Sequence, residues 1–446
     1  ATRIGAVGCA AGGGRRNSFG TRGGRGTFYG VARAPVIRAV HISNYRSVGP
    51  DASLEFPAGE APRLVTLAGA NNVGKSNVLD ALRLVRDVLR DGPVAALHRR
   101  GGFRGVRRFG CDDPVRIVLE AEDSEGVVFW GLAQGVEDER LPYWFDWGCV
   151  LSPAQAAQLA VQVEDMYRTA VDTGRPQPRA ALLYDALRAL PPASMLFPLW
   201  IHGASDGPHP TPSTSRGVRV GLPLWAERNP LWWRFYQSLL TMRMYHPWPP
   251  TLRPAQRVSD EPLMEDDGSN WAATLQRLSP DAMMLLRVAL ARLVPDLVDL
   301  HVIEAGDQLV VEFAHALDDG VHWVDAVRES DGTLRTAALL TALLQDPPPA
   351  VLGIEEPELA VHVRALPMLA DYCESAARRA SVLLTTHSPE LLDHLPADGL
   401  RVVRMGVGGT EVLRLEEAQR RVLRAGVASV GDLLREEGLR PEDGDG

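Results

Sequence analysis

A glycine-rich loop between a strand pattern and a helix pattern is the feature that most limits how this chain can fold. Residues 64–68 form a short apolar run typical of a buried strand, and residues 69–76 read Gly-Ala-Asn-Asn-Val-Gly-Lys-Ser. From Ser76 the apolar residues recur at helical spacing until Gly92-Pro93 ends the pattern. Such a loop turns backbone N–H groups inward, and the helix adds its positive N-terminal dipole. The segment therefore predicts an α/β domain that binds phosphate groups.

Lysine usage singles out one position in this loop. Lys75 is the only lysine among the 47 basic residues, so the chain uses arginine wherever a generic positive charge is needed. A retained lysine indicates a place where a compact ammonium group is required. We expect Lys75 to reach the β- and γ-phosphates of a nucleotide, and the Ser76 hydroxyl to bind Mg²⁺. The alternative is a glycine turn that only caps a helix.

A second apolar run, residues 351–354, ends in adjacent carboxylates. A nucleotide site needs an acidic metal ligand and a group that activates water. Neighbouring side chains on a strand point to opposite faces, so Glu355 and Glu356 should have different roles. We assign Glu355 to the Mg²⁺ shell and Glu356 to polarising the attacking water as general base. The alternative is a solvated acidic strand end.

Five segments together resemble the head domain of ABC-type ATPases of the RecF/SMC branch, and in particular the OLD-like group of predicted AAA-type ATPases. They are residues 44–47 (Asn-Tyr-Arg-Ser), the loop 69–77, residues 330–335 as a signature segment, residues 355–358 (Glu-Glu-Pro-Glu) followed by His362, and residues 385–389 with a switch histidine, His387. The resemblance implies an α/β P-loop NTPase of ABC/RecF-type head architecture. A helical, Trp-rich insertion completes the expected fold.

The resemblance also implies site roles, with ATP and Mg²⁺ as cofactors. It implies nucleotide contacts from Gly69, Asn71, Asn72, Val73, Gly74, Lys75, Ser76 and Asn77. Arg46 would lie near the nucleotide, and His387 would sense the γ-phosphate in cis as a catalytic group. Ser330 and Gly332 would contact the ATP of a second head in trans, using the N-terminus of a helix. A plain surface arginine and a hydrogen-bonded strand-end histidine are the alternatives for Arg46 and His387.

The chain is expected to have five parts. They are a disordered Gly/Arg-rich arm over 1–34, ATPase lobe I with the phosphate loop over 35–125, an insertion with helical and Trp/Pro-rich segments over 126–260, ATPase lobe II with the signature, the acidic strand and the switch histidine over 261–420, and a C-terminal tail over 421–446. Within these parts we expect a hairpin over 115–132, a three-stranded meander over 299–325, and helices over 333–345 and 359–379.

Two departures from the resemblance bear on partners. Residues 99–108, where a Q-loop glutamine was sought, hold five arginines instead, a group that would suit a nucleic-acid backbone, an acidic partner or plain solvent. After His387 the sequence has 59 residues (446 − 387), too few for the TOPRIM nuclease domain of OLD nucleases. We therefore expect any nuclease to be a separate protein.

The sequence thus predicts a cytoplasmic ATPase that forms an ATP-sandwich homodimer and serves as the sensor or motor subunit of a multi-component system. The favoured system is anti-phage defence with a separate effector nuclease. The alternatives are a DNA-repair or recombination clamp that binds duplex DNA through residues 99–108, and a nucleotide-gated scaffold with slow turnover. The four cysteines form no C-x-x-C pair, and no apolar run is long enough to span a membrane.

The substitution Lys75→Arg keeps the positive charge and follows the arginine usage of the rest of the chain. We expect it nevertheless to abolish ATP hydrolysis, because a forked guanidinium cannot replace a point charge inside the loop. The measurement is phosphate release by the purified variant. Hydrolysis at the wild-type rate would contradict the role given to Lys75.

Overall fold

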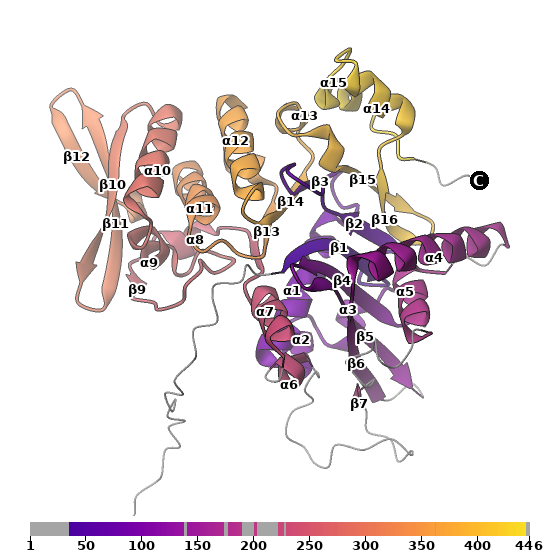
Figure 1. Ribbon diagram of the computed structural model, residues 1–446. Coiled ribbons are helices and arrows are strands. Elements are labelled where there is room, and N and C mark those ends of the chain that lie inside the picture. Colours follow the sequence, from indigo (N-terminus) through magenta and orange to yellow (C-terminus); the bar gives the residue numbers. More distant parts are fainter. Residues whose placement is uncertain are drawn as a thin grey trace, which may run out of the picture. The chain divides into compact units, whose positions relative to one another are not determined.

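The computed structural model describes residues 35–137, 141–173, 177–189, 200–202, 222–226, 229–361 and 363–442 (Figure 1). The expected arm over 1–34, His362 and the last four residues of the expected tail lie outside these ranges.

A mostly parallel sheet carries the phosphate loop. Its strand order is β16-β15-β3-β14-β13-β8, and only β16 runs antiparallel to its neighbour. The strands are β3 (Leu64–Ala68), β8 (Arg243–Tyr245), β13 (Val351–Glu355), β14 (Ser381–Thr386), β15 (Leu400–Gly406) and β16 (Gly409–Arg414). β3 and β14 are buried at every position, as expected for central parallel strands covered on both faces. Because β3, β14, β13 and β8 are parallel, their carboxyl ends meet at one edge.

An antiparallel sheet has the order β2-β1-β4-β5-β6-β7. It contains β1 (Val36–Ser43), β2 (Ala52–Glu55), β4 (Val115–Asp123), β5 (Gly126–Glu137), β6 (Leu141–Leu151) and β7 (Trp200–His202). The expected hairpin over 115–132 is confirmed as β4 and β5. The insertion was expected to start at residue 126, which is the first residue of β5. Because β5 pairs with both β4 and β6, the antiparallel sheet continues across this expected boundary. Trp130 on β5 is fully buried in the core that this sheet shares with α1 (Lys75–Asp91).

The expected meander over 299–325 is confirmed as a third sheet. It consists of β10 (Leu297–Ala305), β11 (Gln308–Leu317) and β12 (Gly320–Asp325), with β9 (Gln256–Arg257) paired to β11. Trp271 on α9 (Trp271–Gln276) packs against Phe313 of β11, with ring centroids 6.4 Å apart. This apolar contact joins the meander to the core around α11 (Asp331–Leu344).

The remaining helices connect and cover these sheets. They are α2 (Pro93–His98), α3 (Phe103–Val106), α4 (Pro153–Asp172), α5 (Arg179–Arg188), α6 (Leu222–Ala226), α7 (Pro230–Leu240), α8 (Pro249–Leu252), α10 (Pro280–Leu293), α12 (Leu366–Ala377), α13 (Pro389–Leu392), α14 (Glu417–Arg424) and α15 (Val430–Glu436), with 3₁₀ turns η2 (Ala326–Arg328), η3 (Pro357–Ala360), η4 (Val363–Ala365) and η5 (Ala397–Gly399). Within the described ranges, no helix combines the length and the apolar character needed to cross a bilayer.

The expected helix over 359–379 was wrong in its first part. Residues 357–360 form the 3₁₀ turn η3 and residues 363–365 form η4, and the α-helix begins only at Leu366. Pro367 lies in the first turn of α12, where its missing N–H costs nothing. In a helix that started at 359, the same proline would remove an interior hydrogen bond.

A buried ionic cluster joins α1 to the strand β8. Asp266 accepts hydrogen bonds from Arg86 Nη1 at 2.8 Å and Arg83 Nε at 3.0 Å, both on α1, and from the backbone N–H of Met244 on β8 at 3.0 Å. Burial opposes ionisation of Asp266, but Arg86 and Arg83 outweigh it, and the pKa of Asp266 lies below its usual value. Arg86 is 4% exposed, and its charge is balanced by Asp266 together with Asp87, whose Oδ1 lies 3.0 Å from Arg86 Nη2.

We expect Asp266→Asn to lower the free energy of unfolding by about 3 kcal/mol, because the buried Arg86 then keeps only Asp87, a carboxylate that also pairs with Arg99 and Arg100. The depressed pKa means that the contribution is complete above the unfolded pKa of Asp266, near 3.8, and is lost as the pH falls through the folded pKa. Urea unfolding of both proteins at neutral and acidic pH measures this. Asp319→Asn, whose side chain is 75% exposed, is the matched control and should change stability by less than about 0.5 kcal/mol.

Candidate nucleotide site

The backbone of the phosphate loop takes left-handed conformations at two positions, Asn72 and Gly74. Gly74 has φ +99°, and a Cβ at this position would overlap the hydroxyls of Thr410 and Ser47. Asn72 also takes a left-handed conformation, with φ +65°. The helix α1 begins directly after the loop at Lys75. The first-turn N–H groups of α1 are therefore at the loop, as an anion site requires.

Lys75 lies inside the loop and is 4% exposed. Its ammonium group donates hydrogen bonds of 2.9 Å to the carbonyl oxygens of Gly69 and Ala70. Its Nζ is 3.8 Å from Oε1 of Glu356. Glu356 directly follows β13, and β14 lies between β13 and the phosphate-loop strand β3. Burial lowers the pKa of Lys75, whereas the carboxylates of Glu356 and Glu358 favour its charged form. The lysine thus links the loop to the acidic strand end.

The two adjacent carboxylates diverge, although strand alternation is only part of the cause. Glu355 is the last residue of β13, whereas Glu356 follows it in a left-handed conformation with φ +40°. The Glu356 N–H donates to the carbonyl of Thr385 at 3.0 Å, which fixes the turn. Glu355 points to the other side, with Oε2 3.6 Å from Nδ1 of His246. Burial raises the pKa of Glu355, although Arg83 opposes this.

The structure places His387 beside Glu356. Its Nδ1 is 3.4 Å from Oε1 of Glu356 and 3.6 Å from Oε1 of Glu358. Glu358 is fixed by hydrogen bonds from the Thr386 hydroxyl at 2.6 Å and the His387 N–H at 3.1 Å. Within the part of the chain that the structure describes, the buried atoms His387 Nδ1 and Glu358 Oε2 take part in no hydrogen bond. Both therefore keep unused hydrogen-bonding capacity.

A hydroxyl from the distant β16 supports the loop. The Thr410 Oγ1 donates to the carbonyl of Val73 at 2.7 Å and is 2.8 Å from the Ser47 hydroxyl. Asn77 Nδ2 donates to the same Ser47 hydroxyl at 2.7 Å. Asn77 was expected to contact the nucleotide, but its amide is engaged in this support. We call Ser47, Asn77 and Thr410 the loop latch.

Arg46 is tied to the helix that follows the loop. Its Nη1 lies 3.0 Å from Oδ2 of Asp80 on α1, and its Nε donates to the Gly105 carbonyl at 3.3 Å. The Tyr45 hydroxyl donates to the same Asp80 carboxylate. These contacts hold the Arg46 side chain at α1, and 33% of its surface remains exposed to solvent.

The signature segment begins a helix as predicted. The Ser330 hydroxyl accepts a hydrogen bond of 3.1 Å from the N–H of Thr333 and caps α11, and Gly332 lies in the first turn. Ser76 lies in the first turn of α1. Ser76, Gly332 and the loop residues Asn71 and Val73 are thus all at helix starts or in the loop, and their roles stay predictions.

His246 is a site residue that the sequence analysis missed. It follows β8, which pairs with β13 in parallel through Tyr245 and Ile354, and this pairing places His246 beside Glu355. Burial, Arg335 and Arg83 all lower its pKa, which favours a neutral ring. Residues 99–108, where the resemblance implies a glutamine, lie beside α1 instead. No local motif in the sequence marks β8 as the neighbour of β13.

Most of the arginines in residues 99–108 are bound within the chain. Arg100 is 8% exposed and pairs with Asp80 at 3.2 Å and Asp87 at 3.0 Å. The others bound are Arg99 with Asp91 at 2.6 Å, Arg107 with Asp112 at 2.5 Å, and Arg108 with Asn44 Oδ1 at 3.1 Å. Arg104 is exposed. The segment is therefore less basic toward solvent than its sequence suggests.

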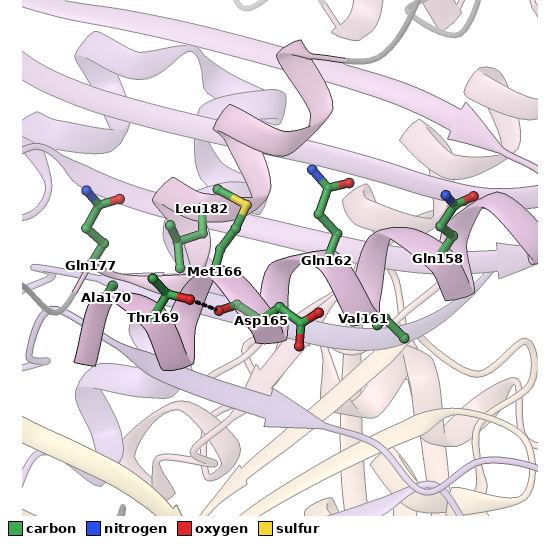
Figure 2. A pocket seen from close by; sticks show the side chains of 9 residues that line it. All are labelled: Gln158, Val161, Gln162, Asp165, Met166, Thr169, Ala170, Gln177 and Leu182. Atoms are coloured by element: carbon green, nitrogen blue, oxygen red, sulfur yellow. Dashed lines mark hydrogen bonds between the residues drawn. The ribbon is translucent and has the colours of Figure 1, made fainter. Parts of the chain in front are cut away.

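A hollow on the surface lies away from the phosphate loop. It has a volume of about 760 Å³ and is formed by α4, α5 and the residue Gln177. Figure 2 shows its lining, where Met166 and Leu182 accompany Gln158 and Gln162. None of the predicted site residues contributes to it. Nor does any group of three or more His, Cys, Asp or Glu side chains within the described ranges form a ready-made metal site.

Comparison with known proteins agrees with this geometry for part of the chain. Residues 265–393 match a family model described as an AAA domain, putative AbiEii toxin, Type IV TA system. This segment contains Ser330, Glu355, Glu356 and His387. The fold is that of a P-loop NTPase. The α/β prediction with an ABC/RecF-type head architecture is confirmed, because the phosphate-loop strand β3, the histidine strand β14 and the acidic strand β13 are neighbours in one parallel sheet.

Several solved structures are similar at low identity. They are an Smc head domain with an extended coiled coil bound to the C-terminal domain of ScpA from Pyrococcus furiosus (13% identity, 88% of this chain and 99% of that chain, TM-score 0.45), an Smc head domain with a coiled coil and joint from Pyrococcus yayanosii (11%, 88% and 100%, TM-score 0.45), and an SMC head domain from Thermotoga maritima (10%, 85% and 99%, TM-score 0.38). No curated protein matches the sequence.

We expect Thr410→Val to weaken ATP binding about tenfold, which corresponds to ~1.4 kcal/mol. Valine keeps the shape but leaves the Val73 carbonyl without its donor and the Ser47 hydroxyl with Asn77 alone. Calorimetric titration with a non-hydrolysable ATP analogue measures the affinity. Thr410→Ser retains the hydroxyl and should bind like the wild type. Equal affinity of the valine and serine variants would show that the loop latch is not needed for binding.

Proposed function

We propose that this chain is an ATP-hydrolysing head that works as an ATP-sandwich homodimer. The observation that carries the proposal is the convergence on one carboxylate oxygen: Glu356 Oε1 is 3.8 Å from Lys75 Nζ and 3.4 Å from His387 Nδ1. These groups come from the ends of three different elements. A phosphate-binding cation, a candidate general base and a candidate phosphate sensor therefore share one small volume.

The phosphate groups of ATP would bind at the loop and the first turn of α1. Lys75 now donates to two loop carbonyls, and phosphate oxygens would offer its ammonium group stronger, charged acceptors. Mg²⁺ fits the residues present, since the Glu355 carboxylate is partly buried with a raised pKa and would be stabilised as an anion by a cation. Ser76 and Glu355 would hold the ion, which supplies charge neutralisation for the phosphates when bound.

Glu356 would accept the proton of the attacking water. Its left-handed backbone and the hydrogen bond to Thr385 hold the carboxylate at the phosphate loop, opposite to Glu355. His387 would donate a hydrogen bond to the γ-phosphate and fix its position. His246 would lie on the metal side, where its neutral ring can accept a hydrogen bond from a bound water.

The second half of the site would come from a second copy of the chain. Ser330 and Gly332 would present the α11 N-terminus to the γ-phosphate bound by the other head. Large apolar side chains are exposed in the turns next to the signature and the acidic strand end, at Val327 (59%), Leu359 (54%) and Val363 (53%). Such side chains suit a face that closes against another copy. Hydrolysis would then release the two heads.

We further propose that this cycle drives a multi-component system in the cytoplasm, with anti-phage defence through a separate nuclease as the favoured setting. The matching family description names a toxin of a type IV toxin–antitoxin system, which is also a system of separate components. The alternative of a DNA clamp gains little support, because Arg99, Arg100, Arg107 and Arg108 are bound within the chain. The scaffold alternative is separated from the favoured one by experiment.

We expect Glu356→Gln to bind ATP and dimerise but to hydrolyse it at least about 100-fold more slowly, because the amide cannot take the proton. Lys75→Ala should lose ATP binding itself. Binding, sedimentation with ATP and phosphate release distinguish the two defects. Glu304→Gln, an exposed strand position, is the matched control and should behave like the wild type. Hydrolysis at the wild-type rate in Glu356→Gln would remove Glu356 from the mechanism. A scaffold predicts that this variant keeps its cellular function.

A further inference from the structure

His315 on β11 lies between two carboxylates. Its Nδ1 is 2.9 Å from Oδ2 of Asp296, and its Nε2 is 2.8 Å from Oε2 of Glu329. Ionised carboxylates only accept hydrogen bonds, so both ring nitrogens must carry a proton to satisfy this geometry. The imidazolium is 14% exposed and Glu329 is 8% exposed. A cation in this place neutralises a carboxylate that is almost withdrawn from solvent.

Glu329 also contacts the signature segment directly. Its second oxygen, Oε1, accepts a hydrogen bond of 2.7 Å from the N–H of Ser330. The Ser330 hydroxyl in turn caps α11 through the N–H of Thr333. A continuous chain of hydrogen bonds thus runs from β11 to the first backbone donor of the signature segment (Figure 1 shows β11 and α11).

Arg253 supports the same turn in a different way. Its Nη1 donates to the carbonyls of Val327 and Glu329, each at 2.7 Å, and its Nη2 is 2.6 Å from Oδ1 of Asp331. Arg253 therefore holds the backbone of the turn. Among the residues that the structure describes, the Glu329 side chain accepts hydrogen bonds from His315 and from the Ser330 N–H alone.

We propose that His315 is a positioning residue that sets the signature segment for its contact in trans. The proposal rests on the proposed ATP-sandwich function, and it assigns to the meander sheet a role in that site. Without the imidazolium, Glu329 would be buried as an unpaired anion and would turn toward solvent. The hydrogen bond to the Ser330 N–H would be lost, while the phosphate loop of the same chain would be untouched.

Because the His315 ring must be charged, the position of the signature segment should depend on pH. The groups that face its ring are Asp296 before β10, Glu329 after η2, and His322 opposite on β12, whose own ring is 2.7 Å from Asp319. The helix α9 carries no ionisable side chain. Burial lowers the pKa of His315, but Glu329 and Asp296 outweigh it and raise the pKa above its ordinary value. The imidazolium is therefore present below the raised pKa and is lost as the pH rises through it.

Mixing of variants tests the proposal. Lys75→Ala offers an intact signature but no nucleotide site, whereas Ser330→Arg offers a nucleotide site but a blocked signature. If the site forms in trans, mixing these two inactive proteins restores hydrolysis at one of the two composite sites. We expect His315→Ala alone to have less than about a tenth of wild-type activity and to bind ATP with unchanged affinity. It should regain activity when mixed with Lys75→Ala, which supplies an intact signature segment. It should gain no activity when mixed with Ser330→Arg, whose signature segment is blocked.

Each outcome has a separate meaning. If Lys75→Ala and Ser330→Arg do not complement each other, the sandwich function fails before His315 is tested. If they do, and His315→Ala is as active as the wild type or is restored by Ser330→Arg, the role of His315 is refuted. Loss of ATP affinity in His315→Ala would indicate general damage and would also refute it. His301→Ala, which removes a histidine paired with Glu312 on the same sheet, is the matched control and should keep full activity.

The pH profile adds a readout that a merely structural role would not change. The activity ratio of wild type to His315→Gln should be large at neutral pH and approach one as the pH rises through the raised pKa of His315. Glutamine can donate to one carboxylate, so this variant should fold and retain part of the contact. A ratio that is constant with pH would show that the imidazolium charge is not used.

Discussion

The buried ammonium group of Lys75 is the interaction on which the rest of the structure depends. A charge that is 4% exposed needs acceptors on every side, and the Gly69 and Ala70 carbonyls supply only part of them. Glu356 completes the set from a strand two positions away in the sheet. The parallel order β3-β14-β13 is therefore a condition for keeping this lysine charged, and the same order brings His387 to the same oxygen.

Around this centre the chain uses polar contacts between distant segments to hold short ones in place. Asp266 joins α1 to β8, and β8 in turn brings His246 to Glu355. Asp80 forms ion pairs with Arg46 and Arg100. Most arginines of residues 99–108 are likewise paired within the chain, so few remain for binding nucleic acid. Apolar packing forms the layers, but the ionic cluster along α1 decides which loops reach the carboxyl edge of the parallel sheet.

The sequence was sufficient for those parts of the site that are encoded locally. The phosphate loop, the acidic strand end and the strand-end histidine each occupy a few consecutive residues, and the structure brings Lys75, Glu356 and His387 together. Thr410 and His246 could not be found in this way, because each enters the site only through strand pairing with residues far away in the chain. Asn77 shows the converse, since its motif position suggested a ligand contact while its amide bonds Ser47. The start of α12 was misplaced because the apolar pattern outweighed Pro367.

The loop latch has a consequence for how the protein is made. Val73 and Thr410 are 337 residues apart, and β3 pairs with β14 and β15, which also follow it far along the chain. During synthesis the phosphate loop leaves the ribosome long before either neighbour of its strand exists. At roughly 5–20 residues per second, that interval lasts tens of seconds. The phosphate loop is thus completed only after β14, β15 and Thr410 have been synthesised, and a chain that stops before them cannot hold the loop in its final shape.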